Sequence, residues 1–205
     1  MRIACIGGGP AGLYFSISMK LLDPSCEVVV LERNKPDDTF GWGVVLSDET
    51  LDNLHANDPI SAASIRENFA YWDDIALHFR GERLVSTGHG FCGIGRKKLL
   101  MLLQERAHSL GVDLRYETEV ESAESYRDEY DVVVANDGLN SKTRMLYKDT
   151  FQPAVDERLC QFVWLGTHQT FKDAFTFIFE ETEHGWVWVH AVSYTHLTLP
   201  TNREV

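Results

Sequence analysis

The chain has 205 residues, of which 44% are hydrophobic, and its formal net charge is −12. This length can bury one large core or two small ones, whereas the acidic balance argues against nucleic acid as a partner, because phosphate binding favours a basic surface. The longest apolar runs are strand-sized, far short of the ~20 residues of a membrane span, so we expect no membrane insertion.

The first predicted elements form a strand, a helix and a second strand. Residues 3–6 are an apolar run that ends in glycines, and residues 10–22 have the helical spacing of apolar residues. Residues 27–31 form a second buried strand. The turn between the first strand and the helix carries Gly-x-Gly-x-x-Gly, and a glutamate follows the second strand. These residues are Gly7, Gly9, Gly12 and Glu32.

A strand-turn-helix-strand context gives this glycine pattern a physical interpretation. Gly7 permits the tight turn, Gly9 lets the backbone approach a pyrophosphate, and Gly12 allows the helix to pack closely. The helix N-terminus offers aligned N–H groups to the phosphates. We expect Glu32 to accept hydrogen bonds from the adenosine ribose, and its charge repels a 2′-phosphate, which favours FAD or NAD over NADP. A glycine-rich turn without a ligand is the alternative, but it leaves Glu32 unexplained.

The remaining elements are expected from periodicity, caps and turn residues. We expect helices at 59–69, 96–110 and 141–147, a hairpin at 75–87, and strands at 112–120, 131–135, 162–166, 174–179 and 186–190. The strands after residue 153 are separated by polar turns without helices, which indicates the opening of an antiparallel sheet over one side of a cavity. For each aromatic residue of this sheet, plain core packing is the alternative.

Residues 41–47 hold two glycines around Trp42, followed by an apolar run. Glycines let a loop lie flat against a large planar ligand, so we expect a loop that faces a cofactor. The alternative is a strained turn whose Trp42 packs in the core.

Two further motifs have both a structural and a functional interpretation. Residues 135–144 read ANDGLNSKTR at the end of a buried strand, where Asp137 and Gly138 suit a turn and Ser141 suits a helix cap. Arg96 begins a predicted helix, and its guanidinium suits phosphate oxygens because it stays charged and presents a rigid fork of donors. A solvated basic turn is the alternative for Arg96.

Together these motifs resemble the p-hydroxybenzoate hydroxylase-like FAD monooxygenases. The segments that carry the resemblance are GGGPAGLYF at 7–15, ERN at 32–34, PDDTFGWGVV at 36–45, RKKL at 96–99, ANDGLNSKTR at 135–144, FVWLGT at 162–167 and FTFIF at 175–179. The resemblance implies an α/β fold, with a GR2-type Rossmann-like FAD-binding domain at 1–74 and 88–158. The hairpin at 75–87 and residues 159–191 would begin an antiparallel β-sheet substrate domain.

The resemblance also implies the cofactor and its contacts. FAD is the expected cofactor and NAD(P)H the co-substrate; the Asp-Gly turn would lie near the flavin and its pyrophosphate, and Arg96 would contact the cofactor. The residues expected to bind it are Gly7, Gly9, Pro10, Ala11, Gly12, Glu32, Arg33, Arg96, Val120, Asp137 and Gly138. No catalytic side chain and no metal ligand are predicted.

For the intact protein, the resemblance implies that reduced FAD captures dioxygen as a C4a-hydroperoxide, whose distal oxygen hydroxylates or epoxidises an activated aromatic ring. The likeness narrows to a branch that acts on aryl-CoA thioesters such as salicyloyl-CoA or 2-aminobenzoyl-CoA, and it is compatible with a homodimer. Three alternatives stay open: a flavin reductase or oxidase without oxygen insertion, a binding protein like the Rab GDP-dissociation inhibitors, and a truncated fragment without activity.

The two ends of the chain carry further expectations. Residues 192–205 resemble a translated transposon-end sequencing adapter, so we expect a non-native tail and a gene cut near Ala191; a native polar loop is the alternative. The first strand leads directly into the glycine turn, which leaves no room for a signal peptide. The four cysteines have no metal-like spacing with histidines, so we expect buried, reduced thiols in a cytoplasmic protein.

Overall fold

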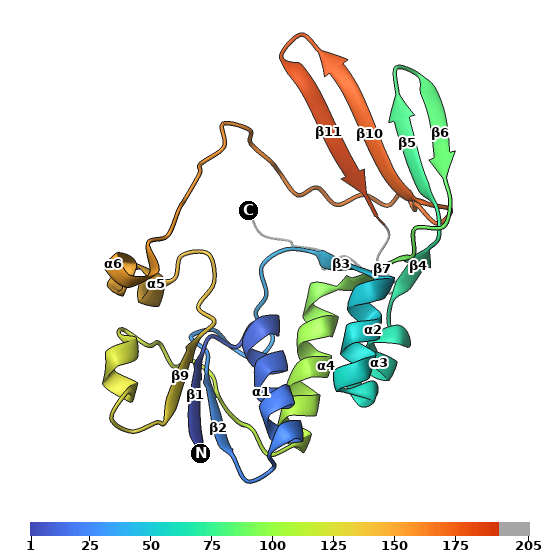
Figure 1. Cartoon of the computed structure of the whole chain (residues 1–205). Helices are drawn as coiled ribbons and strands as arrows, with labels where there is room; N and C mark the ends of the chain where they lie inside the picture. The colour runs from blue at the N-terminus through green and yellow to red at the C-terminus, as the bar shows by residue number, and fades with distance from the viewer. Residues whose placement is uncertain (193–205) are drawn as a thin grey trace. The chain divides into compact units, whose positions relative to one another are not determined.

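The computed structural model describes residues 1–192 (Figure 1). Beyond Val192, the predicted non-native tail therefore lies outside the described residues. The described residues fold into two compact units: the first comprises Met1–Thr39 and Leu99–Val163, and the second comprises Phe40–Lys98 and residues 164–192.

A parallel four-stranded sheet forms the centre of the first unit. The strands are β1 (Arg2–Ile6), β2 (Glu27–Leu31), β8 (Asp113–Arg115) and β9 (Val132–Ala135). They lie in the order β8-β2-β1-β9, and every neighbouring pair is parallel. Because parallel strands end at the same edge, the glycine turn after β1 and the Asn136–Asp137 corner after β9 leave the sheet side by side.

Both faces of this sheet are covered by apolar side chains. Helix α1 (Pro10–Leu22) lies against β1 and β2, with Leu13 and Ile17 fully buried (Figure 1). A second cluster, formed by Ala4, Val29 and Leu31, is packed by Val120, Tyr126, Tyr130 and Val133. The other helices of this unit are the part of α4 (Arg96–Ser109) from Leu99 on, the 3₁₀ turn η1 (Ala123–Tyr126), α5 (Lys142–Leu146) and α6 (Lys148–Phe151).

Among the described residues, the second unit contains two sheets, two short helices and the first residues of α4. Its elements are β3 (Gly43–Ser47), α2 (Asp48–Asn57), α3 (Pro59–Arg66), β4 (Ala70–Trp72), β5 (Ile75–Phe79), β6 (Glu82–Ser86), β7 (Phe91–Gly95), β10 (Phe175–Thr182) and β11 (Gly185–Ala191). The first sheet has the order β3-β7-β4 and the second the order β11-β10-β5-β6. The pairing of β5 with β10 joins the early hairpin to the late strands; the predicted domain bounds themselves stay a prediction.

Most of the predicted elements are confirmed. The first strand, the helix from Pro10 and the second strand occur as expected, and Gly111 follows α4 at φ +79. The hairpin of β5 and β6 turns at Arg80 and Gly81, which both have positive φ. This geometry matches the right-handed twist of paired strands.

Four expectations were wrong in detail, and one helix was not expected. Residues 162–166 form no strand, because an apolar run also needs a partner strand and none of the described strands pairs with it. Residues 112–120 contain only the short β8, and α2 was not predicted. The late sheet is mixed rather than antiparallel, since β10 runs parallel to β5. Finally, much of the expected cofactor-facing loop at 41–47 is strand β3, paired with β7.

The cysteines agree with expectation at three of four positions. Cys5, Cys26 and Cys92 are buried thiols, whereas Cys160 is exposed. Burial raises the pKa of the Cys92 thiol to about 11, so this thiol is protonated and unreactive at neutral pH. In the described part of the chain, no helix has the length and apolarity needed to cross a membrane.

Candidate functional site

The glycine turn and the residue after β9 meet at the edge of the parallel sheet. Gly7 donates its N–H to the carbonyl of Leu31 at 2.8 Å, and Asn136 donates its N–H to the carbonyl of Ile6 at 2.7 Å. Gly7 has φ +103, and a Cβ added there would overlap the carbonyl oxygen of Asn136. Glycine is therefore required at position 7 by both conformation and space. The two motifs that are far apart in the sequence thus form one surface.

The next two glycines of the pattern have opposite surroundings. A Cβ at Gly12 would overlap the carbonyl oxygen of Gly7, so helix α1 packs directly on the turn. In contrast, a Cβ at Gly9 would meet no atom within 4 Å. Gly9 therefore borders open space at the start of the helix, where the backbone can approach a ligand closely.

The N-terminus of α1 has no protein group that caps it. Gly9 is the N-cap residue, there is no capping side chain, and the first turn contains no acidic residue. Pro10 lacks an N–H, and within residues 1–192 the amides of Ala11 and Gly12 have no acceptor. Unpaired amides and the helix dipole favour an anion at this place.

Glu32 is held by donors of the protein itself. Its Oε2 accepts a hydrogen bond from the Gly8 N–H at 2.7 Å, and its Oε1 accepts from the backbone N–H and the side-chain Nδ2 of Asn34 at 2.8 and 2.7 Å. A carboxylate has about four acceptor positions, so three bonds fix its orientation and leave capacity for a hydroxyl. Sequence reasoning missed Gly8 and Asn34; the second of three consecutive glycines was the available signal for Gly8.

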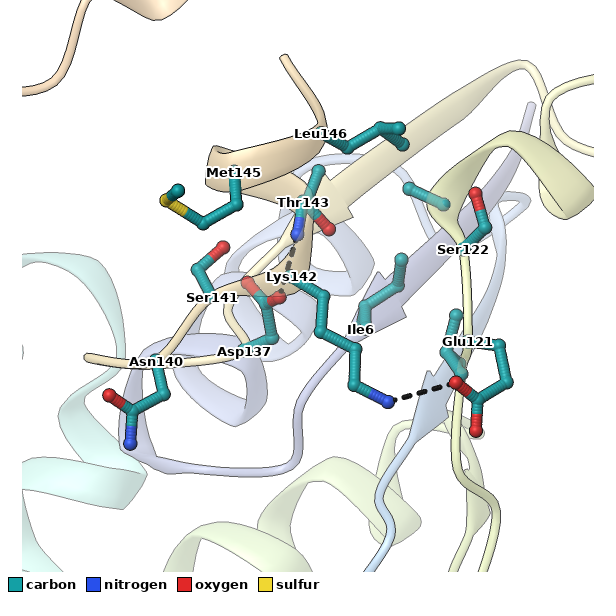
Figure 2. A pocket seen from close by; sticks show the side chains of 12 residues that line it. Ile6, Glu121, Ser122, Asp137, Asn140, Ser141, Lys142, Thr143, Met145 and Leu146 are labelled. Atoms are coloured by element: carbon teal, nitrogen blue, oxygen red, sulfur yellow. Dashed lines mark hydrogen bonds and ion pairs between the residues drawn. The ribbon is translucent and has the colours of Figure 1, made fainter. Parts of the chain in front are cut away.

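A cavity of about 430 Å³ lies beside this edge of the sheet, within the first unit (Figure 2). Two residues predicted to bind the cofactor, Val120 and Asp137, line it together with Ile6, the last residue of β1. Its other walls come from η1 with the residues before it and from α5 with the corner that precedes it. These residues are Glu121, Ser122, Ala123, Asn140, Ser141, Lys142, Thr143, Met145 and Leu146.

Asp137 connects the corner to the start of α5. Its Oδ2 accepts a hydrogen bond from the backbone N–H of Thr143 at 3.2 Å (Figure 2), and the hydroxyl of Ser141 accepts from the N–H of Arg144 at 2.9 Å. Partial burial raises the pKa of Asp137, but hydrogen bonds from Ser141 and from the amides of Thr143 and Lys142 outweigh it, so the net pKa lies below its ordinary value of 3.8. The turn-and-cap interpretation of this motif is therefore confirmed in geometry.

We expect Asp137→Asn to lower the free energy of unfolding at neutral pH by about 1 kcal/mol, the scale of a helix cap. Because the folded-state pKa is depressed, the carboxylate stabilises the fold above its ordinary value of 3.8, and this contribution is lost as the pH falls through the lower folded value. Urea unfolding at several pH values measures the difference. If the difference in the free energy of unfolding between the unaltered protein and Asp137→Asn stayed constant down to acidic pH, the Asp137 carboxylate would not be its source.

The other predicted site residues lie in different surroundings. Gly138 is exposed at φ +80, and Arg33 is an exposed side chain directly after Glu32. Arg96 belongs to the second unit, where its backbone N–H donates to the carbonyl of Trp42 at 3.0 Å. The structure thus places the glycine turn, Glu32 and Asp137 at one edge of the sheet, whereas the binding roles of the predicted residues, including Arg33 and Arg96, stay predictions.

The residues of the first unit fit a dinucleotide. Open space at Gly9 and unpaired amides at α1 suit a pyrophosphate, and the fixed Glu32 carboxylate suits ribose hydroxyls. Beside them, the buried Nδ2 of Asn136 has no hydrogen-bond partner. This unpaired donor beside the glycine turn is unusual for a protein interior, because buried polar groups are nearly always hydrogen-bonded.

Comparisons with known proteins agree with this geometry. A protein-family model described as FAD binding domain matches residues 1–199. Salicyloyl-CoA 5-hydroxylase of a Streptomyces species is 44% identical over 191 residues, which are 93% of this chain and 37% of that protein. Protodeoxyviolaceinate monooxygenase of Chromobacterium violaceum is 33% identical over 199 residues, which are 95% of this chain and 52% of that protein.

Solved structures show the same fold. A crystal structure of a mutant 2-methyl-3-hydroxypyridine-5-carboxylic acid oxygenase superposes with a TM-score of 0.62 at 24% identity, covering 70% of this chain and 41% of that one. In length, the chain spans between about a third and about a half of the curated relatives named above.

Proposed function

The chain belongs to the FAD binding domain family, and from this membership we propose that the intact protein is an NAD(P)H-dependent monooxygenase that inserts one oxygen atom into an activated aromatic ring. The observation that carries the proposal is the meeting of the glycine turn with the Asn136–Asp137 corner at one edge of the sheet. The glycine turn and the Asn136–Asp137 corner thereby bind one and the same cofactor, which is FAD.

Each part of the site has a task in holding this cofactor. The amides of Ala11 and Gly12 and the dipole of α1 bind the pyrophosphate, while Glu32 accepts hydrogen bonds from the adenosine ribose. Val120 lines the same cavity as Asp137. Bound FAD supplies redox chemistry that no side chain provides, taking electrons from NAD(P)H and delivering them to dioxygen, so that one oxygen atom enters the ring and the other leaves as water.

The proposed substrate is an aryl-CoA thioester, such as salicyloyl-CoA or 2-aminobenzoyl-CoA. Support comes from the 44% identity to a protein named salicyloyl-CoA 5-hydroxylase. A more distant relative from Streptosporangium sibiricum, 28% identical over 195 residues, is named a monooxygenase of an anthranilyl group on an aryl-carrier protein. In both names the aromatic acyl group is attached to a carrier. A cytoplasmic location and a homodimeric assembly belong to the same proposal and depend on the resemblance.

The test uses the product of the full-length gene. We expect it to bind FAD, to oxidise NADH or NADPH faster when salicyloyl-CoA or 2-aminobenzoyl-CoA is added, and to place one atom of isotope-labelled dioxygen in the aromatic product. The matched controls are the free aromatic acids and coenzyme A.

Three results would contradict parts of the proposal. Peroxide release without labelled product would indicate a reductase or an oxidase. Stimulation by free acids but by neither thioester would refute the substrate class. A protein that shows no flavin absorbance, even after FAD is added, would favour a binding function.

A further inference from the structure

Val120 lies in a short segment that has little backbone support of its own. Before it, the N–H of Thr118 donates to the carbonyl of Glu32 at 2.9 Å, and after it the hydroxyl of Ser122 accepts from the N–H of Glu124 at 3.3 Å as η1 begins. Between these bonds, the backbone of residues 119–121 forms no hydrogen bond with any described residue. The Val120 side chain packs on the core of the sheet, so its amide and carbonyl are available to a ligand.

One lysine ties this segment to the opposite wall of the cavity. The Nζ of Lys142 lies 3.0 Å from Oε2 of Glu121 (Figure 2). It also lies 2.9 Å from Oε1 of Glu119. The two glutamates are the neighbours of Val120 on either side, whereas Lys142 is the first residue of α5, directly after the Ser141 cap. The hydrogen bonds with Lys142 lower the pKa of Glu119, and those with both glutamates raise the pKa of Lys142.

The position of the segment indicates which end of FAD it serves. Its N-terminal side is bonded to Glu32 through Thr118, and Glu32 is the residue assigned to the adenosine ribose. Without a cation, Glu119 and Glu121 would repel each other and the anionic pyrophosphate. The bridge therefore has two effects: it fixes the segment, and it offsets negative charge close to the dinucleotide.

We propose that Lys142 is a positioning residue for FAD, which bridges the two glutamates flanking Val120 and so holds the Val120 backbone in place for the adenosine end of the cofactor. This inference rests on the proposed function and adds to it a role for a side chain that does not itself touch the ligand. All three charged groups are substantially exposed, so their effect is moderate and sensitive to salt.

The experiment is a titration of the purified full-length gene product with FAD, measured through the quenching of flavin fluorescence. At low ionic strength we expect Lys142→Met to raise the Kd by about fivefold, the scale of exposed ion pairs. The difference should shrink near 1 M salt, where the screening length is about 3 Å. Lys142→Arg should restore binding to within about twofold, since it keeps the charge. Lys148→Met, an exposed lysine outside the cavity, is the matched control.

The outcomes separate this inference from the proposed function. Absence of FAD binding by the unaltered full-length protein would overturn both. Tight binding by the unaltered protein and equally tight binding by Lys142→Met at low salt would overturn the role of Lys142 alone. A lowered melting temperature of the FAD-free Lys142→Met protein with an unchanged Kd would likewise overturn it, because the lysine would then only stabilise the fold. Failure of Lys142→Arg to restore binding would also count against the bridge.

Discussion

Replacing Gly12 by alanine is expected to lower the free energy of unfolding by about 3 kcal/mol or more, at the upper end of overpacking effects. The added methyl group would overlap the carbonyl oxygen of Gly7, which is backbone and cannot rotate away. Helix α1 cannot retreat either, because Leu13 and Ile17 are fully buried beneath it. Urea unfolding followed by circular dichroism measures the change.

The sign of this effect makes the test specific. At an ordinary position inside a helix, glycine to alanine stabilises the protein by up to about 1 kcal/mol, because alanine is the better helix former. Gly95→Ala, at the end of strand β7, is the control for adding a methyl group where it meets no neighbouring atom within 4 Å and where φ is not positive. A Gly12→Ala protein as stable as Gly95→Ala would show that the helix does not pack on the turn as described.

Replacing Gly9 by alanine is expected to leave the fold intact and to remove most of the affinity for FAD. The added methyl group meets no protein atom within 4 Å, and φ at this residue is −71, a value that alanine adopts freely. The methyl would instead occupy the space that the pyrophosphate needs at the uncapped end of α1. We expect a loss of about 2 to 3 kcal/mol of binding free energy, or about 30- to 150-fold in Kd.

Two measurements on the same protein check this second expectation. The melting temperature of the FAD-free Gly9→Ala protein should match that of the unaltered chain, while fluorescence titration should show the weakened binding. Unchanged affinity would mean that the cofactor does not approach the backbone at Gly9. A large fall in the melting temperature would mean that the space at Gly9 is filled by the protein itself.

The local parts of this fold could be predicted from the sequence. The bounds of α1 and β2 follow from an apolar period, Pro10 at the first helical position and Asp23-Pro24 after the last. The cap formed by Ser141 was also predictable, because it depends on a few neighbouring residues. That the Asp-Gly turn lies near the glycine turn was implied by the family resemblance; the parallel order of β1 and β9, which places the two turns at one edge, comes from the structure.

The remaining features depend on partners that no local pattern names. Residues 162–166 have the composition of a strand, but none of the described strands pairs with them. Strand β5 pairs in parallel with β10, where Ile75 lies opposite Phe175. In the sequence, Asn34 is an ordinary polar residue; only the structure shows that its side-chain amide donates a hydrogen bond to Glu32. The bridge from Lys142 to Glu119 and Glu121 requires two loops to be adjacent, which only the tertiary structure provides.

The place of β9 next to β1 sets the order of events while the chain is being made. Arg2 and Asp131, joined by a hydrogen bond at the start of these two strands, are 129 residues apart in the chain. At about 5 to 20 residues per second, a ribosome adds the final strand roughly 6 to 26 seconds after the glycine turn. During that interval the nascent chain lacks the Asn136–Asp137 corner, so the edge of the sheet at which we propose that FAD binds is completed only late in synthesis.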